Sequence, residues 1–321
     1  MRFTLRQLSY FIAAGESLSV TKAAEKVNIS QPSISAAISH LESEFNVQLF
    51  LRHHAQGLSL TPAGTRLLRA AKESLRSASE LYEVANDVHD HISGALNVAT
   101  FFTFAPLIAP ELWAGFSGRH AAARMTLTEG SEAEIIESLR LARVDLALTY
   151  NLNLPPDVEF IELAQLKTYV LVSADHRFAS RCSIRLAELI DDPFILIDLP
   201  LTRDYFLGLF RQIGGTPRVI MESKSTASLR SYVAAGIGYG MMTVRPLNTR
   251  AENGLPLVYL PLDDVAHSLS FGIASLAEIR RSRVADAFIE YCREVISDES
   301  LPGMLPCYKM ERPTEPPPQT S

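Results

Sequence analysis

A heptad pattern of mostly apolar residues between residues 68 and 92 is the feature that most constrains the fold. Its positions step by three and four residues and are occupied by Leu68, Ala71, Leu75, Ala78, Tyr82, Ala85, His89 and Ile92. Thr61 and Pro62 suit the N-cap and the first position of a helix. We therefore expect one helix from Pro62 to Ile92, about 46 Å long. Because it is too long to pack only on the short segment before it, we expect it to dimerise with a second copy. A helix that caps the following domain is the alternative.

The segment before this helix, residues 1–62, predicts closely spaced short helices. Residues that favour helix N-caps begin each of them: Thr4, then Ser19 or Thr21, then Ser30. After the third helix, alternating residues on either side of a Gln56–Gly57 turn predict a β-hairpin. Two helices joined by a short turn, with a hairpin beside the second, are typical of a winged helix-turn-helix. An ordinary small helical bundle is the alternative.

Residues 94–300 alternate strand-like and helical stretches, which predicts an α/β domain and makes the chain an α/β multidomain protein. The strand-like stretches are 96–100, 125–129, 145–150, 169–174, 194–198, 219–222, 239–243 and 269–274, and the helical ones are 105–117, 131–143, 203–213, 226–235 and 279–296. This order predicts βαβ units and a mainly parallel sheet. We expect two lobes, 94–166 plus 270–299 and 167–269, with a ligand cleft beyond the strand carboxyl ends.

The end of the chain differs in composition from the α/β domain. Six of the 18 prolines lie from residue 300 onward. Such a segment buries little apolar surface, and we expect residues 301–321 to form a disordered tail.

The formal net charge of −6 by itself argues against nucleic-acid binding. However, residues 1–62 carry +1, and the charges of residues 1–93 cancel, so the whole negative excess lies beyond residue 93. Residues 1–62, the DNA-binding head, therefore offer few positively charged side chains that could contact DNA phosphates. We therefore expect one head alone to bind DNA weakly, with affinity gained by joining several heads.

Composition also restricts the compartment and the chemistry. The three cysteines form no C-x-x-C pair, and no stretch approaches the ~18 apolar residues of a membrane span. We expect a cytoplasmic protein with no metal, no cofactor and no membrane partner. We also expect no enzyme, because G-x-S-x-G and P-loop motifs are missing and residues 236–240 are better interpreted as a tight helix-to-strand turn.

The run SVTKAAEKVNISQPSIS at residues 19–35, followed by Leu41-Glu42, Leu49-Phe50 and Leu60-Thr61, resembles the LysR-type transcriptional regulator family. Residues 144–148 (VDLAL) and 233–238 (VAAGIG) resemble its effector domain. The resemblance implies a winged helix-turn-helix, a dimerising linker helix over residues 63–93, and a two-lobed periplasmic-binding-protein-like domain. It further implies double-stranded promoter DNA, a small-molecule effector, RNA polymerase and further copies of the chain, as homodimer or homotetramer, as partners.

The resemblance also indicates which residues meet DNA. The start of the second helix of the motif would enter the major groove with Gln31, Pro32, Ser33, Ser35, Ala36, Ser39 and His40. Gln31 suits an adenine edge, and Pro32 and Ala36 suit thymine methyl groups. Many family members carry Arg and a long polar residue at the positions of Ala36 and Ala37. Phosphate contacts would come from Thr21, Lys22, Arg52, His53 and His54.

The family's effector position implies a second set of residues: Phe102, Thr103, Ser131, Thr149, Thr202, Ser225 and Thr226. Most are hydroxyl residues at helix starts or strand ends, where free N–H groups favour an anion. We expect a small carboxylate as effector, with Arg203 and Arg245 at the rim. The alternative is that these hydroxyls are simple helix caps.

Three other interpretations remain open from the sequence. A small-molecule receptor without a DNA role would share the α/β body but would not need the 93-residue head. A thiol-based redox sensor would need a cysteine pair, which Cys182 and Cys292 do not resemble. A regulator of the same family that senses no ligand is the third.

Overall fold

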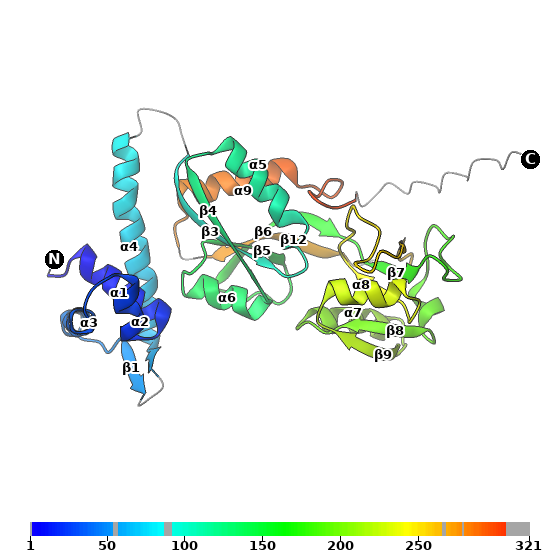
Figure 1. The fold of residues 1–321 in the computed structure, drawn as a ribbon, viewed down its shortest axis with the longest axis horizontal. Coiled ribbons are helices and arrows are strands. Elements are labelled where there is room, and N and C mark those ends of the chain that lie inside the picture. Colours follow the sequence, from blue (N-terminus) through cyan, green and yellow to red (C-terminus); the bar gives the residue numbers. More distant parts are fainter. Residues whose placement is uncertain (1, 54–56, 87–91, 265–267, 278, 306–321) are drawn as a thin grey trace, which may run out of the picture.

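The computed structural model describes residues 2–53, 57–86, 92–264, 268–277 and 279–305, arranged as a helical head, a long helix and two α/β lobes in a row (Figure 1). The head contains α1 (Leu5–Ser17), α2 (Val20–Lys26), α3 (Gln31–Phe45) and the hairpin β1 (Phe50–His53) and β2 (Gly57–Leu60). The hairpin is antiparallel, with Phe50 opposite Leu60. The winged helix-turn-helix prediction is confirmed.

Local sequence signals set the helix starts in the head. The Thr4 hydroxyl accepts from the Gln7 N–H, and the Gln7 side chain accepts from the Thr4 N–H at 2.9 Å, as a capping box requires. Ser19, rather than Thr21, caps α2, and Ser30 caps α3 with Pro32 in its first turn. These caps satisfy N–H groups that a helix leaves without partners.

The long helix α4 (Pro62–Asn86) begins inside the head. The Thr61 hydroxyl caps it by accepting from the Gly64 N–H at 2.8 Å. Leu68 and Ala71 are buried in the same core as Phe11 and Leu41 of the head. A Cβ at Gly15 would lie only 3.0 Å from Leu68 Cδ1, so α1 and α4 pack closely there. The first half of the heptad pattern therefore packs against the head of the same chain.

The prediction that this helix reaches Ile92 is wrong. Ile92 and Ser93 are not helical, and Ile92 packs against the core of the first lobe instead of continuing the heptad face. Gly94 then starts a strand at φ +116, in the region that favours glycine. His54 and His89 lie outside the described residues.

Lobe one has a five-stranded sheet in the order β4-β3-β5-β12-β6. Its elements are β3 (Gly94–Phe101), α5 (Ile108–Arg119), β4 (Ala123–Gly130), α6 (Glu132–Arg140), β5 (Leu146–Tyr150), β6 (Val158–Leu166), β12 (Leu269–Leu276) and α9 (Arg283–Val295). Strand β3 runs parallel to β4 and β5, whereas β12 runs antiparallel to β5 and β6. The sheet is therefore mixed, and the prediction of a mainly parallel sheet holds only for three strands.

Lobe two holds two smaller strand groups. Its elements are β7 (Tyr169–Ser173), the 3-10 helix η1 (Leu186–Leu189), β8 (Pro193–Ile197), α7 (Thr202–Gln212), β9 (Arg218–Ser223), α8 (Thr226–Ala234), β10 (Gly240–Met242) and β11 (Leu257–Pro261). Strands β8 and β9 are parallel, and β10 and β11 flank β7 antiparallel. Gly236, at φ +77, makes the expected turn after α8.

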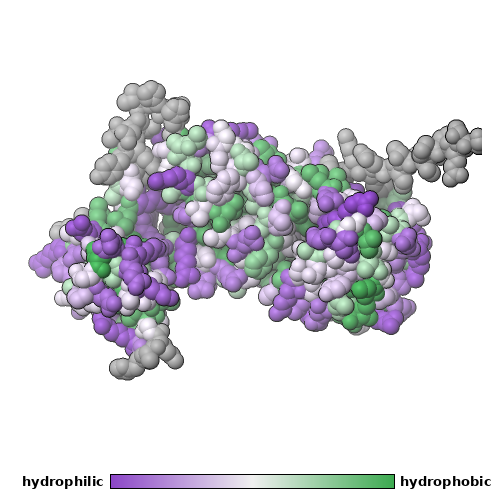
Figure 2. Space-filling model, viewed as in Figure 1, coloured by the Kyte–Doolittle hydropathy of each residue, from purple (hydrophilic) through white to green (hydrophobic). Residues whose placement is uncertain are grey.

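The prediction that a disordered tail begins at residue 301 places its start too early. Leu301 and Met304 are buried, and Met304 forms a β-bridge with Pro246 of lobe two. The Leu305 N–H donates to the Arg245 carbonyl at 2.8 Å. Apolar side chains inside the proline-rich stretch explain this packing, and residues 306–321 lie outside the described residues. Figure 2 shows hydrophilic side chains over much of the head and over its side of lobe one.

Candidate functional site

The outer face of α3 carries the side chains predicted to meet base edges. Gln31, Pro32, Ser33, Ala36, Ser39 and His40 are exposed and Ser35 is half-buried, whereas Ile34, Ala37, Ile38 and Leu41 are buried beneath them. The Ser33 hydroxyl is shared with the capping Ser30 hydroxyl at 2.8 Å. The helix therefore offers one continuous small and polar face to solvent.

The residues predicted to contact phosphates lie beside this face on two other elements. Thr21 and Lys22 are exposed in the first turn of α2, and Arg52 and His53 are exposed on β1 of the wing. Within the described residues neither Lys22 nor Arg52 makes an ion pair, which leaves both charges available. His53 Nε2 shares a hydrogen bond of 2.8 Å with the Ser59 hydroxyl.

The effector candidates of lobe one share one edge of the sheet. Because β3, β4 and β5 are parallel, their carboxyl ends meet, and Phe101 at the end of β3 lies opposite Gly130 at the end of β4. Phe102 and Thr103 follow β3, Ser131 follows β4, and Thr149 is near the end of β5. Phe102 is exposed, while Phe101 and Phe104 are core residues.

The candidates of lobe two share an equivalent edge. Parallel strands β8 and β9 end together, with Ile197 opposite Ser223. Thr202 starts α7 just after β8, and Ser225 and Thr226 start α8 just after β9. The N-termini of two helices therefore open at this edge, as that of α6 does in lobe one.

The two edges meet at Tyr150, which the sequence analysis did not single out. Its hydroxyl bonds the Thr243 hydroxyl of lobe two at 2.6 Å and the Thr103 hydroxyl of lobe one at 3.2 Å. Burial, with a smaller contribution from the nearby Tyr205 of α7, raises the pKa of Tyr150 to about 12. The phenol therefore stays protonated and acts as a hydrogen-bond link between the lobes. These residues are too far apart in sequence to form a motif.

The candidate hydroxyls have two different roles. Ser131 and Ser225 cap α6 and α8, accepting from the N–H groups of Glu134 and Ser228 at 3.4 and 3.3 Å. In contrast, the buried hydroxyls of Thr149 and Thr202 have no hydrogen-bond partner among the described residues. A buried hydroxyl without a partner costs about 1–3 kcal/mol, so these two threonines are the better ligand candidates.

Two family models together match most of the chain. Residues 5–65 match the model described as "Bacterial regulatory helix-turn-helix protein, lysR family", and residues 89–297 match the "LysR substrate binding domain". The chain belongs to the LysR family. It is a DNA-binding transcriptional regulator with a C-terminal effector-binding domain.

Several relatives match more than nine-tenths of this LysR-family regulator. The PA01 protein of Pseudomonas aeruginosa is 34% identical, with 92% of this chain and 99% of that chain covered at a TM-score of 0.63. HinK, a LysR family transcriptional regulator of the same organism, is 34% identical, with 91% and 98% covered at a TM-score of 0.62. The HTH-type transcriptional regulator YvbU of Bacillus subtilis is 29% identical, with 92% and 100% covered.

Charged groups near the effector edges differ from the expectation for the regulator. Arg203 pairs with Asp198 at 2.9 Å and Glu222 at 2.7 Å, so it is not a free rim cation. Arg245 is half-buried beside the Tyr169 ring. Glu132, in the first turn of α6, is buried, and loss of hydration raises the pKa of its carboxyl to about 7. This burial was not predictable from the sequence, because an acid in a first helical turn is normally solvated.

The two cysteines within the described residues differ in their exposure to solvent. Cys182 is exposed, and Cys292 is buried, which raises the pKa of its thiol. In the part of the chain that the structure describes, no group of His, Cys, Asp and Glu is arranged to hold a metal ion. Among the same residues, no helix is both long and apolar enough to cross a lipid bilayer.

Proposed function

We propose that this regulator binds a small organic acid at the junction of its two lobes and that binding changes how its heads engage promoter DNA. One observation carries the proposal. The buried hydroxyls of Thr149 and Thr202 have no partners among the described residues, and they lie at strand edges where helix N-termini open. Helix N-termini favour negative charge, and a carboxylate would accept from such hydroxyls.

The hydrogen-bonded link at Tyr150 supports the second half of this proposal. It joins lobe one to lobe two through Thr243. An acid that contacts both edges would favour one relative position of the lobes, since a ligand shifts a conformational equilibrium by its difference in affinity. This change in the relative position of the lobes would alter the position of the DNA-binding heads through lobe one.

A thermal-shift panel of small carboxylates on the full chain tests the effector proposal. An acid that binds should raise the melting temperature, because ligand binding stabilises the folded chain by RT ln(1 + [L]/Kd). In the variant Thr149→Val/Thr202→Val we expect that shift to fall by at least half, while Thr249→Val, at an exposed position of lobe two, keeps it. A panel without any shift, or a shift that survives the double variant, contradicts the proposal.

We further propose that the regulator works as a homodimer or homotetramer joined through α4, in the cytoplasm and without catalytic turnover. The exposed Leu81, 70% accessible on the outer part of α4, supports this, because it is a large apolar side chain next to the heptad position Tyr82 that the rest of the chain does not cover. RNA polymerase is the expected partner at the promoter.

Sedimentation of the full chain tests the oligomer. We expect Leu81→Glu to shift it toward the monomer, because the variant places a charge in an apolar interface. Leu247→Glu, at a position 61% exposed on lobe two, serves as the matched control. If Leu81→Glu sediments like the unmodified chain, the proposal that the interface lies on α4 is contradicted.

A further inference from the structure

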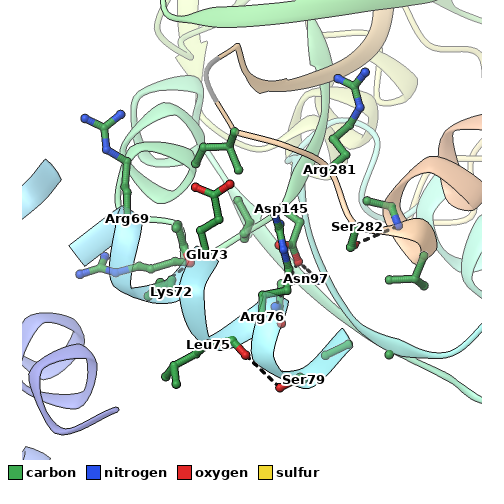
Figure 3. A pocket seen from close by; sticks show the side chains of 18 of the residues that line it. Arg69, Lys72, Glu73, Leu75, Arg76, Ser79, Asn97, Asp145, Arg281 and Ser282 are labelled. Atoms are coloured by element: carbon green, nitrogen blue, oxygen red, sulfur yellow. Dashed lines mark hydrogen bonds between the residues drawn. The ribbon is translucent and has the colours of Figure 1, made fainter. Parts of the chain in front are cut away.

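A half-open cavity lies between the long helix α4 and lobe one, apart from the effector edges. It has a volume of about 500 Å³. In Figure 3, Arg76 of α4 lies beside Asn97 and Asp145 of lobe one, and Arg69, Lys72 and Glu73 are carried by the same helix. Ile12 and Glu16 of α1 close the side toward the head. The cavity is therefore walled by the DNA-binding part and the sensing part of the same chain.

The residues that line this cavity carry a net positive charge, whereas the whole chain is net negative. Three acidic residues line it, Glu16, Glu73 and Asp145, against six basic ones: Arg69, Lys72, Arg76, Arg124, Arg143 and Arg281. The whole chain carries −6. Basic side chains are thus concentrated where head and sensor face each other.

Part of this positive charge is already neutralised by the protein. Glu16 lies 2.7 Å from Lys72 and also pairs with Lys26. Arg281 pairs with Glu159 and Asp286 at 3.2 and 3.1 Å.

Three guanidinium groups are left over. Within the described residues Arg69, Arg124 and Arg143 make no ion pair, and they come from three separate elements: α4, β4 and the turn after α6. Arginine favours planar carboxylate and phosphate groups, which it binds through paired N–H donors.

Lys72 holds the two walls together and shows how crowded the positive charges are. Its ammonium group donates to the carbonyls of Leu141 and Ala142 at 3.0 and 2.7 Å, so it joins α4 to lobe one while it pairs with Glu16. Burial lowers the pKa of Lys72, and the charge of Arg143 lowers it further. Like charges gathered in a partly enclosed space favour the entry of an anion.

We propose that this cavity is a second ligand site, which binds a small metabolite carrying two or more phosphate or carboxylate groups. Its volume suits a small molecule, since ligand pockets are commonly about 300–1,000 Å³. A single carboxylate can pair with only one or two guanidinium groups, whereas a polyanion can reach guanidinium groups on both walls. Such a ligand would fix the position of the head relative to lobe one independently of the organic acid at the lobe junction.

Calorimetric titration of the full chain with pyrophosphate and with citrate, in magnesium-free buffer, tests this site. At least one probe should bind with one molecule per chain. The variant Arg124→Gln/Arg143→Gln, at two exposed positions, should raise Kd by at least tenfold. Arg211→Gln, an exposed arginine of lobe two, is the matched control and should leave Kd unchanged. Pyrophosphate binding alone indicates a phosphorylated ligand, and citrate binding alone indicates a polycarboxylate.

The same titration separates this site from the organic-acid site. Thr149→Val/Thr202→Val should bind the probe as the unmodified chain does. Absence of binding by both probes overturns the proposal, as does a Kd that the double arginine variant does not change. A loss of binding confined to the double threonine variant also overturns it, because the probe would then occupy the lobe junction.

Discussion

Glu132 illustrates, at the scale of single residues, a property that the sequence did not indicate. Its carboxyl is buried in the first turn of α6, and burial raises its pKa to about 7. A carboxyl whose pKa is raised in the folded state favours folding below its unfolded pKa of 4.5, and that stability is lost as the pH rises through about 7. Local sequence fixes the cap Ser131 but not how deeply its neighbour is covered by the rest of lobe one.

We therefore expect Glu132→Gln to stabilise lobe one at pH 8 by about 1–3 kcal/mol, since the amide carries no charge to bury. At pH 5 the two proteins should differ little, because the carboxyl is then mostly protonated. Urea unfolding followed through Trp113, the single tryptophan, reports on this lobe. Glu129→Gln, at a nearby exposed position, should show no gain at either pH. Equal stability of Glu132→Gln and the unmodified chain at pH 8 would contradict the burial argument.

The head's helices are the elements that the sequence predicted best. Their caps and apolar spacing act within a few residues, so Ser19, Ser30 and Thr61 mark helix starts without knowledge of the fold. The direction of β12 was not predictable in this way, because it pairs with β5 and β6 across more than 100 residues of sequence. The hydroxyls proposed as effector ligands could be selected one by one from the sequence, but the Tyr150 link between the lobes could not.

Substitutions on α2, α3 and β1 should weaken DNA binding in two different ways. Lys22→Ala and Arg52→Ala should weaken binding to all duplexes alike and reduce the salt slope by about one, as phosphate contacts do. Gln31→Ala should reduce discrimination between selected and scrambled duplexes by about 1–3 kcal/mol. Anisotropy titrations on a duplex selected from a random pool measure both effects. Lys26→Ala is the control, since Lys26 already pairs with Glu16 at 2.7 Å. Equal behaviour of Gln31→Ala and Lys22→Ala would contradict base reading by α3.

Helix α4 should prove essential to the head. Leu68 is 1% exposed in the head core, and truncating such a residue costs about 2–5 kcal/mol. Leu68→Ala should therefore increase amide exchange in α1 and α3 and weaken DNA binding, while Trp113 fluorescence shows an intact lobe one. Leu81→Ala makes the same chemical change at an exposed position and should leave the exchange of α1 and α3 unchanged. Unaltered exchange in Leu68→Ala would show that the head folds without α4.

In the whole molecule, Lys72 is one of the side chains that join the two halves. It bonds Glu16 of the head and two carbonyls after α6. The architecture of head, helix and two lobes was predictable from periodicity and the family resemblance. This junction was not, because it depends on residues more than 50 positions apart that carry no shared pattern.

Removing that junction should free the head. We expect Lys72→Met to increase the maximum dimension of the chain in solution scattering at equal oligomeric state, because the methionine keeps the apolar stem and loses the ammonium bonds. Lys224→Met, exposed in lobe two, is the matched control. Superimposable scattering curves for Lys72→Met and the unmodified chain would show that other contacts hold the head in place.

The burial of Leu68 and Ala71 in the head, with Ile92 in the core of lobe one, also decides where this regulator can be cut and rejoined. A hybrid that takes this DNA-binding part and ends near residue 62 would lack part of its own core. A fusion joint placed after Asn86 would carry that core intact and leave Ile92 with the sensor it packs against. The exchangeable unit of this chain is therefore head plus helix, not the head alone.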